Sequence, residues 1–318
     1  DPSGGGVAII NCSPTLVDIV LAENTADIGG GIYMSGSNAN LKNITVRGNG
    51  ANIGGGIYAT DGEPTLDGIL VEGNVAYWGA GIYFENSQPY LAYSLIIGNE
   101  AFIEGGGIYQ SGGESIIEWT LFENNNGFDY GAGVVAYQTS IDANQITVAG
   151  NSSGIGSFVA SYSSVISIRN SILWGNNGTL IYAPEAAGVS YLDVSYSDID
   201  GGDELLANIS NVIFNTQGGN INVDPLFCLS DSSFYGLQLA SSCLTASDSS
   251  GVIGAFDSYC ETLILEDELM PNELLTLSNY PNPFNPTTNI VYELPSDQFF
   301  TLLIYDLNGN LIRKLKSE

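Results

Sequence analysis

Carboxylates are the residues of this sequence that could carry chemistry, since its 318 residues hold 35 Asp and Glu, 6 Lys and Arg and no histidine. Two carboxyl groups that lie roughly 5 to 9.5 Å from each other can hydrolyse a glycosidic bond. The densest group comprises Asp193, Asp198, Asp200, Asp203 and Glu204. Asp198, Asp200 and Asp203 resemble half of a calcium loop but lack its regular ligand spacing. We expect a solvated turn here, with calcium as the alternative and no other metal or cofactor.

The missing histidine and the net charge of −29 exclude several classes of protein. Nucleophile pairs and metal sites that depend on histidine cannot form. Nucleic-acid binding needs clustered Lys and Arg, so we expect no nucleic-acid partner. No apolar run approaches the ~18 residues of a membrane-spanning segment.

Basic residues are too few for a site that takes an acidic sugar. Before residue 261 they are Lys42, Arg47 and Arg169. Asp67 and Glu72 follow Lys42 and Arg47 by 25 residues each. We therefore expect ion pairs between neighbouring repeats, each contributing about 0.2–1 kcal/mol.

Aromatic residues recur at the same interval in two series. One series is Tyr33, Tyr58, Tyr83 and Tyr109, and the other is Tyr77, Phe102 and Phe128. Stacked rings stabilise neighbouring repeats by about 0.5–1.5 kcal/mol per pair. We expect structural stacking, with a face that binds surface glycans or proteins as the alternative.

A repeat of 25 or 26 residues must position these side chains. Glycine clusters begin at Gly4, Gly29, Gly54, Gly79, Gly105 and Gly131. Asparagines recur in step with them, at Asn24, Asn49, Asn74, Asn99, Asn125, Asn151 and Asn176. Two markers in step indicate a repeat architecture.

The glycine-rich half of each repeat excludes a leucine-rich repeat, because interior glycines cost a helix about 1 kcal/mol each. Short strands separated by turns predict an all-β, right-handed parallel β-helix of roughly nine coils. Ile32, Ile57, Ile82, Ile108 and Val134 would face inward, and the tyrosines outward. The asparagines suit a turn column, since asparagine tolerates positive φ and its amide can bond the next one. From about residue 222 the sequence changes to a plausible cap for the open end.

The four cysteines have the pattern of a secreted protein rather than of a zinc or redox site. Cys228 and Cys243 are the expected disulfide, with Cys243 and Cys260 as the alternative. Cys12 lies about eight coils away, roughly 38 Å at the strand spacing, so we expect it to be available for an intermolecular bond.

The glycine triplets and motifs such as Phe122-Glu123-Asn124-Asn125 resemble the repeats of polymorphic outer-membrane proteins, which are β-helical surface adhesins. The ending from Asp224 to Cys260 resembles that of secreted right-handed β-helix proteins. Both resemblances imply an extracellular β-helix over residues 1–260.

The segment Asn279-Tyr280-Pro281-Asn282-Pro283-Phe284-Asn285-Pro286-Thr287-Thr288, with Ile304-Tyr305-Asp306-Leu307-Asn308-Gly309, is similar to the C-terminal sorting domain of type nine secretion substrates. The resemblance implies export and handling by secretion and surface-attachment machinery. Residues 279–318 would form a small, incomplete β-sandwich-like domain after an acidic linker at 261–278.

Together these features predict a non-enzymatic extracellular protein, either a surface adhesin or a subunit of an extracellular filament. The alternative is a carbohydrate-active enzyme that uses carboxylates on the β-helix face. We also weigh head-to-tail self-association against a monomer, because the repeat begins at Gly4 and the strand edge of the first coil is then available for pairing.

Overall fold

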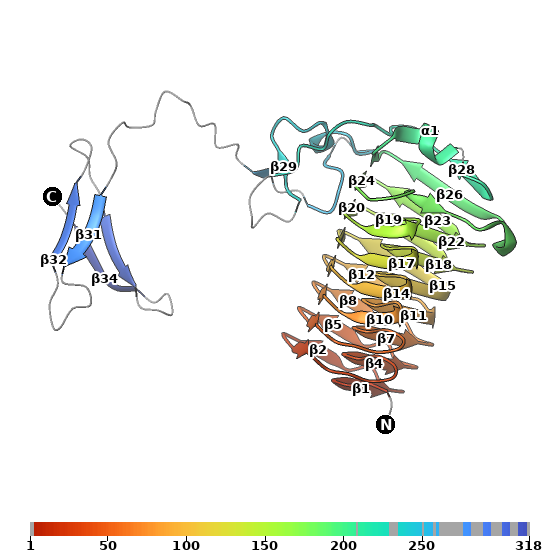
Figure 1. The fold of residues 1–318 in the computed structure, drawn as a ribbon, viewed down its shortest axis with the longest axis horizontal. Helices are drawn as coiled ribbons and strands as arrows, with labels where there is room; N and C mark the ends of the chain where they lie inside the picture. Colours follow the sequence, from red (N-terminus) through yellow and green to blue (C-terminus); the bar gives the residue numbers. More distant parts are fainter. Residues whose placement is uncertain are drawn as a thin grey trace. The chain divides into compact units, whose positions relative to one another are not determined.

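The computed structural model describes residues 3–207, 209–228, 235–249, 251–256, 259–260, 276–280, 289–293, 301–305 and 311–316. The chain divides into two compact units, Asp1–Glu261 and Thr262–Glu318. The first unit is a parallel β-helix whose coils follow one another in Figure 1 from the red N-terminal end to the green end.

Each coil places one short strand on each of three faces, and strands of one face pair in parallel with those of neighbouring coils. The tyrosine face consists of β1 (Val7–Ile10), β4 (Ile32–Ser35), β7 (Ile57–Thr60), β11 (Ile82–Ser87), β15 (Ile108–Glu118), β18 (Val134–Tyr137), β22 (Val159–Tyr162) and β25 (Ile181–Tyr182). The second face consists of β2 (Thr15–Val17), β5 (Asn40–Lys42), β8 (Thr65–Asp67), β12 (Tyr90–Ala92), the end of β15, β19 (Ser140–Asn144), β23 (Val165–Arg169), β26 (Ser190–Ser195) and β28 (Val212–Asn215).

The third face is an 8-stranded sheet of β3 (Val20–Ala22), β6 (Thr45–Arg47), β9 (Leu70–Glu72), β13 (Leu95–Ile97), β16 (Leu121–Glu123), β20 (Thr147–Ala149), β24 (Ile172–Trp174) and β27 (Asp198–Ile199). A further 4-stranded sheet forms in the middle coils from β10 (Val75–Trp78), β14 (Glu100–Glu104), β17 (Asn126–Tyr130) and β21 (Ser152–Ile155). The solenoid therefore has about 8 full coils, and the roughly nine expected include a last one represented by β28 alone.

Alternation of side chains along the strands builds the core. Ile32, Ile57, Ile82 and Ile108 are fully buried and lie in register on the tyrosine face, while the tyrosine that follows each one points outward. The inward column of isoleucines is as predicted from the sequence.

The asparagine ladder is buried rather than exposed in a turn. Each amide from Asn24 to Asn151 donates through Nδ2 to Oδ1 of the asparagine one coil further along, at 2.9–3.0 Å. Most of them also donate to a main-chain carbonyl, as Asn99 does to Val71. Positive φ belongs to the preceding residue, such as Gly98 at 60°. The expected reason for asparagine, tolerance of positive φ, is therefore wrong, whereas the amide-to-amide bonding is correct.

Glycine is required where neighbouring coils approach most closely. A Cβ atom at Gly30 would lie 2.4 Å from the carbonyl oxygen of Gly55 and 2.6 Å from that of Gly50. Any larger residue would push two coils apart, which explains why the glycine clusters recur with the repeat.

A short helix that the sequence did not predict covers the end of the core. The helix α1 (Gly202–Ala207) follows the last full coil and buries Leu206 completely among the core side chains. The acidic segment expected to be a solvated turn is thus partly helical. A 3-10 turn, η1 (Glu185–Ala187), lies in an earlier connection.

The segment from about residue 222, expected to cap the open end, packs against the side of the last coils. It contains β29 (Leu237–Gln238), the 3-10 turn η2 (Ser242–Leu244) and β30 (Tyr259–Cys260). Its core of Leu237, Cys243 and Ile253 includes Ile172 of β24. The amide of Gly254 donates to the carbonyl of Asn170, which follows β23, one coil before β26.

Neither expected disulfide pairing is correct. Cys243 is a buried free thiol that donates to Oδ2 of Asp198 at 3.1 Å. Cys228 is disulfide-bonded, so its bond does not involve Cys243. Cys12 is free and exposed, and its intermolecular role stays a prediction.

The second unit contains two antiparallel strand pairs. In one, β31 (Thr276–Tyr280) pairs with β32 (Asn289–Glu293), and in the other β33 (Thr301–Tyr305) pairs with β34 (Leu311–Lys316). The end of the predicted linker, residues 276–278, therefore belongs to a strand. Most of the linker and the proline-rich motif at 281–288 lie outside the described residues.

Candidate binding face

The acidic residues singled out from the sequence do not converge on a common site. Asp198 is fully buried and accepts from the amide of Val223 and the thiol of Cys243. Asp200 accepts from the amide of Gly175, and Asp203 from the side chain of Asn220. Within the described ranges, no three acidic or cysteine side chains are grouped so that they could hold a metal ion. The calcium alternative has no support in this geometry.

The basic side chains of the first unit lie on the second and third faces. Lys42 forms an ion pair with Asp67 at 3.6 Å, as predicted. Arg47 lies in register with Glu72, but among the described residues the only other ion pair joins Arg169 to Asp142. The tyrosine face and the 4-stranded sheet carry no Lys or Arg in their described strands.

The tyrosine column is a stack in which the rings cover one another. Successive rings from Tyr33 to Tyr109 have centroids 4.8–5.5 Å apart and interplanar angles of 20° or less. Tyr58 is only 7% exposed, and its hydroxyl donates to Glu85. Because the inner ring faces are already occupied, this column stabilises the solenoid and offers little surface to a ligand.

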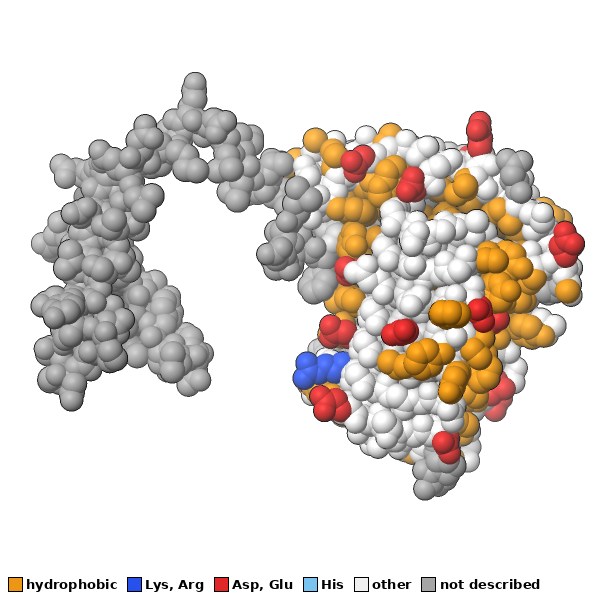
Figure 2. Space-filling view, in the orientation of Figure 1, with side chains coloured by type: hydrophobic (Ala, Val, Ile, Leu, Met, Phe, Trp, Pro, Cys, Tyr) orange, Lys and Arg blue, Asp and Glu red, His pale blue; other side chains and the backbone are white. Residues whose placement is uncertain are grey.

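The second aromatic series is exposed. We define the aromatic patch as Tyr77, Trp78, Phe102 and Phe128, whose exposed fractions are 46%, 37%, 50% and 69%. Tyr77 is tilted by 49° to Trp78 and by 56° to Phe102, so ring faces remain open to solvent. Figure 2 shows orange side chains gathered over the region of β10, β14 and β17, interrupted by a few red carboxylates. Exposed apolar patches occur at interaction surfaces of proteins, which makes this cluster a candidate for one.

Glu104 is the carboxylate at the edge of this patch. The β-sheet register places Trp78 on one side of it and Tyr130 on the other, each one coil away. Tyr162, on the neighbouring tyrosine face, donates to its Oε1 at 3.2 Å. Trp78, Glu104 and Tyr130 thus form one column, which we call the Glu104 column.

Burial raises the pKa of Glu104 above its ordinary value, and the negative charge of Asp129 raises it further, while the hydrogen bond from Tyr162 acts in the opposite direction. The same environment affects the tyrosines. Burial and then the charges of Glu85 and Glu104 raise the pKa of Tyr83 to about 12. Glu104 is therefore a carboxylate in a partly desolvated, electronegative site.

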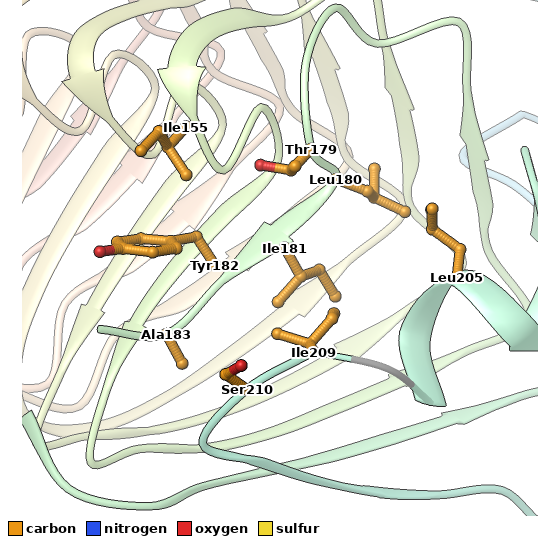
Figure 3. Close-up of a pocket in the computed structure, with 9 residues that line it drawn as sticks. All are labelled: Ile155, Thr179, Leu180, Ile181, Tyr182, Ala183, Leu205, Ile209 and Ser210. Atoms are coloured by element: carbon orange, nitrogen blue, oxygen red, sulfur yellow. The ribbon is translucent and has the colours of Figure 1, made fainter. Parts of the chain in front are cut away.

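An apolar pocket of about 310 Å³ lies at the far end of the same side of the solenoid. Figure 3 shows Ile155, Leu180, Ile181 and Ile209 around it, with Leu205 of α1 at its margin. Tyr182 also lines the pocket and stacks on Tyr130 at 5.3 Å, which links the pocket to the Glu104 column. Its volume is near the lower end of ligand pockets, which start at about 300 Å³.

Comparison with known proteins agrees with this architecture. The family described as a right-handed beta helix region matches residues 30–195. The chain belongs to this right-handed β-helix family. No curated protein and no solved structure matches the sequence. In the described part of this β-helix protein, no helix is long and apolar enough to cross a membrane.

The Glu104 column is not among the sites predicted from the sequence, although the spacing of its residues carries a signal. Trp78, Glu104 and Tyr130 follow one another at intervals of 26 residues, immediately before three glycine clusters. Their residue types differ, so a search for identical residues in each repeat passes over them.

Proposed function

We propose that this β-helix protein is a non-enzymatic extracellular binding protein, a surface adhesin or filament subunit, and that the aromatic patch is its contact surface. The observation that carries the proposal is the exposure of four aromatic side chains on three consecutive strands of a rigid sheet. A stacked solenoid holds such side chains at fixed spacing, so little conformational entropy is lost on binding. The sorting-domain resemblance and the acidic composition support an extracellular location.

Binding assays with a patch variant test this function. Phe102 and Phe128 would be replaced together by Ser. In a control, Ser would replace Ile116 of the second face and Tyr93 of the turn after β12, which are 48% and 62% exposed. Both variants and the wild type would be screened against immobilised neutral polysaccharides and basic proteins. We expect the wild type and the control to bind, and the patch variant to lose that binding. Equal binding by all three proteins would contradict it.

A second function is favoured by the state of Glu104. A carboxyl group with a raised pKa is suited to act as a general acid in glycoside hydrolysis, and Asp129 is close enough to influence its charge. The chain would then be a carbohydrate-active enzyme. The test is whether the wild type releases reducing sugar from a neutral polysaccharide and Glu104→Gln does not. That result would establish this function in place of the first.

A further inference from the structure

Glu104 is a half-buried carboxylate that has no cationic partner within the described residues. Within the first unit, the bases are Lys42, Arg47 and Arg169, which lie on β5, β6 and β23 and so belong to other faces. Tyr162 donates to Oε1 of Glu104, and Oε2 accepts no hydrogen bond from the residues that the structure describes. A partly desolvated charge without a counter-charge is costly for the free protein.

We propose that the Glu104 column binds a basic side chain, Lys or Arg, of a protein partner. This inference rests on the proposed binding function and names the chemistry of the partner. The cation would lie at the free oxygen of Glu104, between the rings of Trp78 and Tyr130.

Three properties of the column favour a cation. A carboxylate attracts it directly, and the faces of Trp and Tyr attract it through their π-electrons, more strongly where water is excluded. The 35 carboxylates of the chain against 6 basic side chains add a long-range attraction for basic partners. The exposed rings of Tyr77 on β10 and Phe102 on β14, the strands that also carry Trp78 and Glu104, can cover the aliphatic stem of the same side chain.

The ring geometry favours a polypeptide over a neutral glycan. Sugar rings stack on flat, coplanar aromatic platforms, whereas Tyr77 is tilted by 49° and 56° to its two neighbours. Tilted rings around a carboxylate surround a cation from several directions. The patch also extends beyond the column to Phe128, so a partner longer than one side chain would be in contact with it.

Calorimetry of the full chain with a pentalysine amide peptide at ~150 mM salt tests the proposal, because screening at that ionic strength weakens non-specific attraction. The same peptide with acetylated side chains removes the charge but keeps the stem. Glu104→Gln is compared with Glu100→Gln, which removes the same charge from the exposed end of the same strand, β14. Circular dichroism verifies that both variants are folded.

We expect pentalysine to bind and the acetylated peptide to bind at least about tenfold more weakly. Glu104→Gln should weaken binding about tenfold, and Glu100→Gln by no more than about threefold. Equal losses in the two variants would show non-specific charge attraction and overturn the inference. A second result would also overturn the inference: the protein binds a neutral polysaccharide but not pentalysine, and Trp78→Ala loses the polysaccharide. That result would leave the proposed binding function intact.

Discussion

The hydroxyl group of Tyr162 donates a hydrogen bond of 3.2 Å to Oε1 of Glu104, although the two residues are 58 positions apart in the chain. The contact joins the tyrosine face to the 4-stranded sheet across the glycine turns. It also fixes the orientation of a carboxylate whose pKa is raised by burial. The charge state of Glu104 is therefore coupled to the stability of the fold.

That coupling predicts a pH dependence. The pKa of Glu104 in the folded protein is higher than the value of 4.5 expected for the unfolded chain. The folded state therefore binds this proton more tightly, and stability is lost as pH rises from about 4.5 through the raised pKa. Glu104→Gln should remove this loss. As the pH rises from about 4 to about 7, the free energy of unfolding of the variant should therefore increase relative to that of the wild type.

Chemical denaturation at several pH values measures this difference. Glu100→Gln is the control, since its exposed side chain is on the same strand. A constant difference between Glu104→Gln and wild type over the whole range would show that Glu104 titrates normally.

The inward and outward columns predict unequal effects of substitution at adjacent positions. Ile82 is fully buried, so Ile82→Asp places an unpaired charge in the core and should cost about 4 kcal/mol or more. Tyr83→Ser removes ring stacking on the outer surface and should cost about 1–2 kcal/mol. Equal losses in urea denaturation would contradict the observed register.

The asparagine ladder predicts a large effect from a small change. Asn99 donates to Asn125 and Val71 and accepts two bonds from Asn74, all of them buried. Asn99→Ala leaves these groups unsatisfied and should reduce the free energy of unfolding by about 2–4 kcal/mol. Asn52→Ala, at an exposed site, should change it by less than about 0.5 kcal/mol. A similar result for both variants would indicate that the ladder contributes little.

The cysteines should differ in reactivity. Cys12 is exposed, whereas burial and then the charge of Asp198 raise the pKa of the Cys243 thiol and disfavour its reactive thiolate. A maleimide reagent should label Cys12 in the native protein and Cys243 only after unfolding. Cys12 and Cys243 are both free thiols, so unfolding without reductant should add Cys243 to the labelled sites. Labelling of native Cys243 would contradict the buried placement.

The sequence predicts the solenoid well because the repeat itself encodes the register. Isoleucine, tyrosine and asparagine recur at one interval, and parallel strands stack residues that occupy equivalent positions. The expected partner of Lys42 follows from the same arithmetic. Where the repeat decays, prediction fails, as for α1, whose single buried Leu206 has no periodic neighbour.

The candidate site was predicted only in part. The series of Tyr77, Phe102 and Phe128 is visible as a column of aromatic residues, whereas Glu104 has no equivalent acid in the neighbouring coils. Its environment depends on Tyr162, two coils away on another face. Contacts of that kind, like the thiol of Cys243 on Asp198, require the folded arrangement and cannot be read from spacing.

The central claim, that the aromatic patch is the binding face, is tested most directly by hydroxyl-radical footprinting of the wild-type protein with and without saturating pentalysine amide. We predict that oxidation of Trp78, Phe102 and Phe128 falls when the peptide is added. Oxidation of Tyr191 on the second face and of Tyr93 in the turn after β12, which are 48% and 62% exposed, should stay unchanged. Protection of Tyr93 and Tyr191 with no change at the aromatic patch would contradict the account.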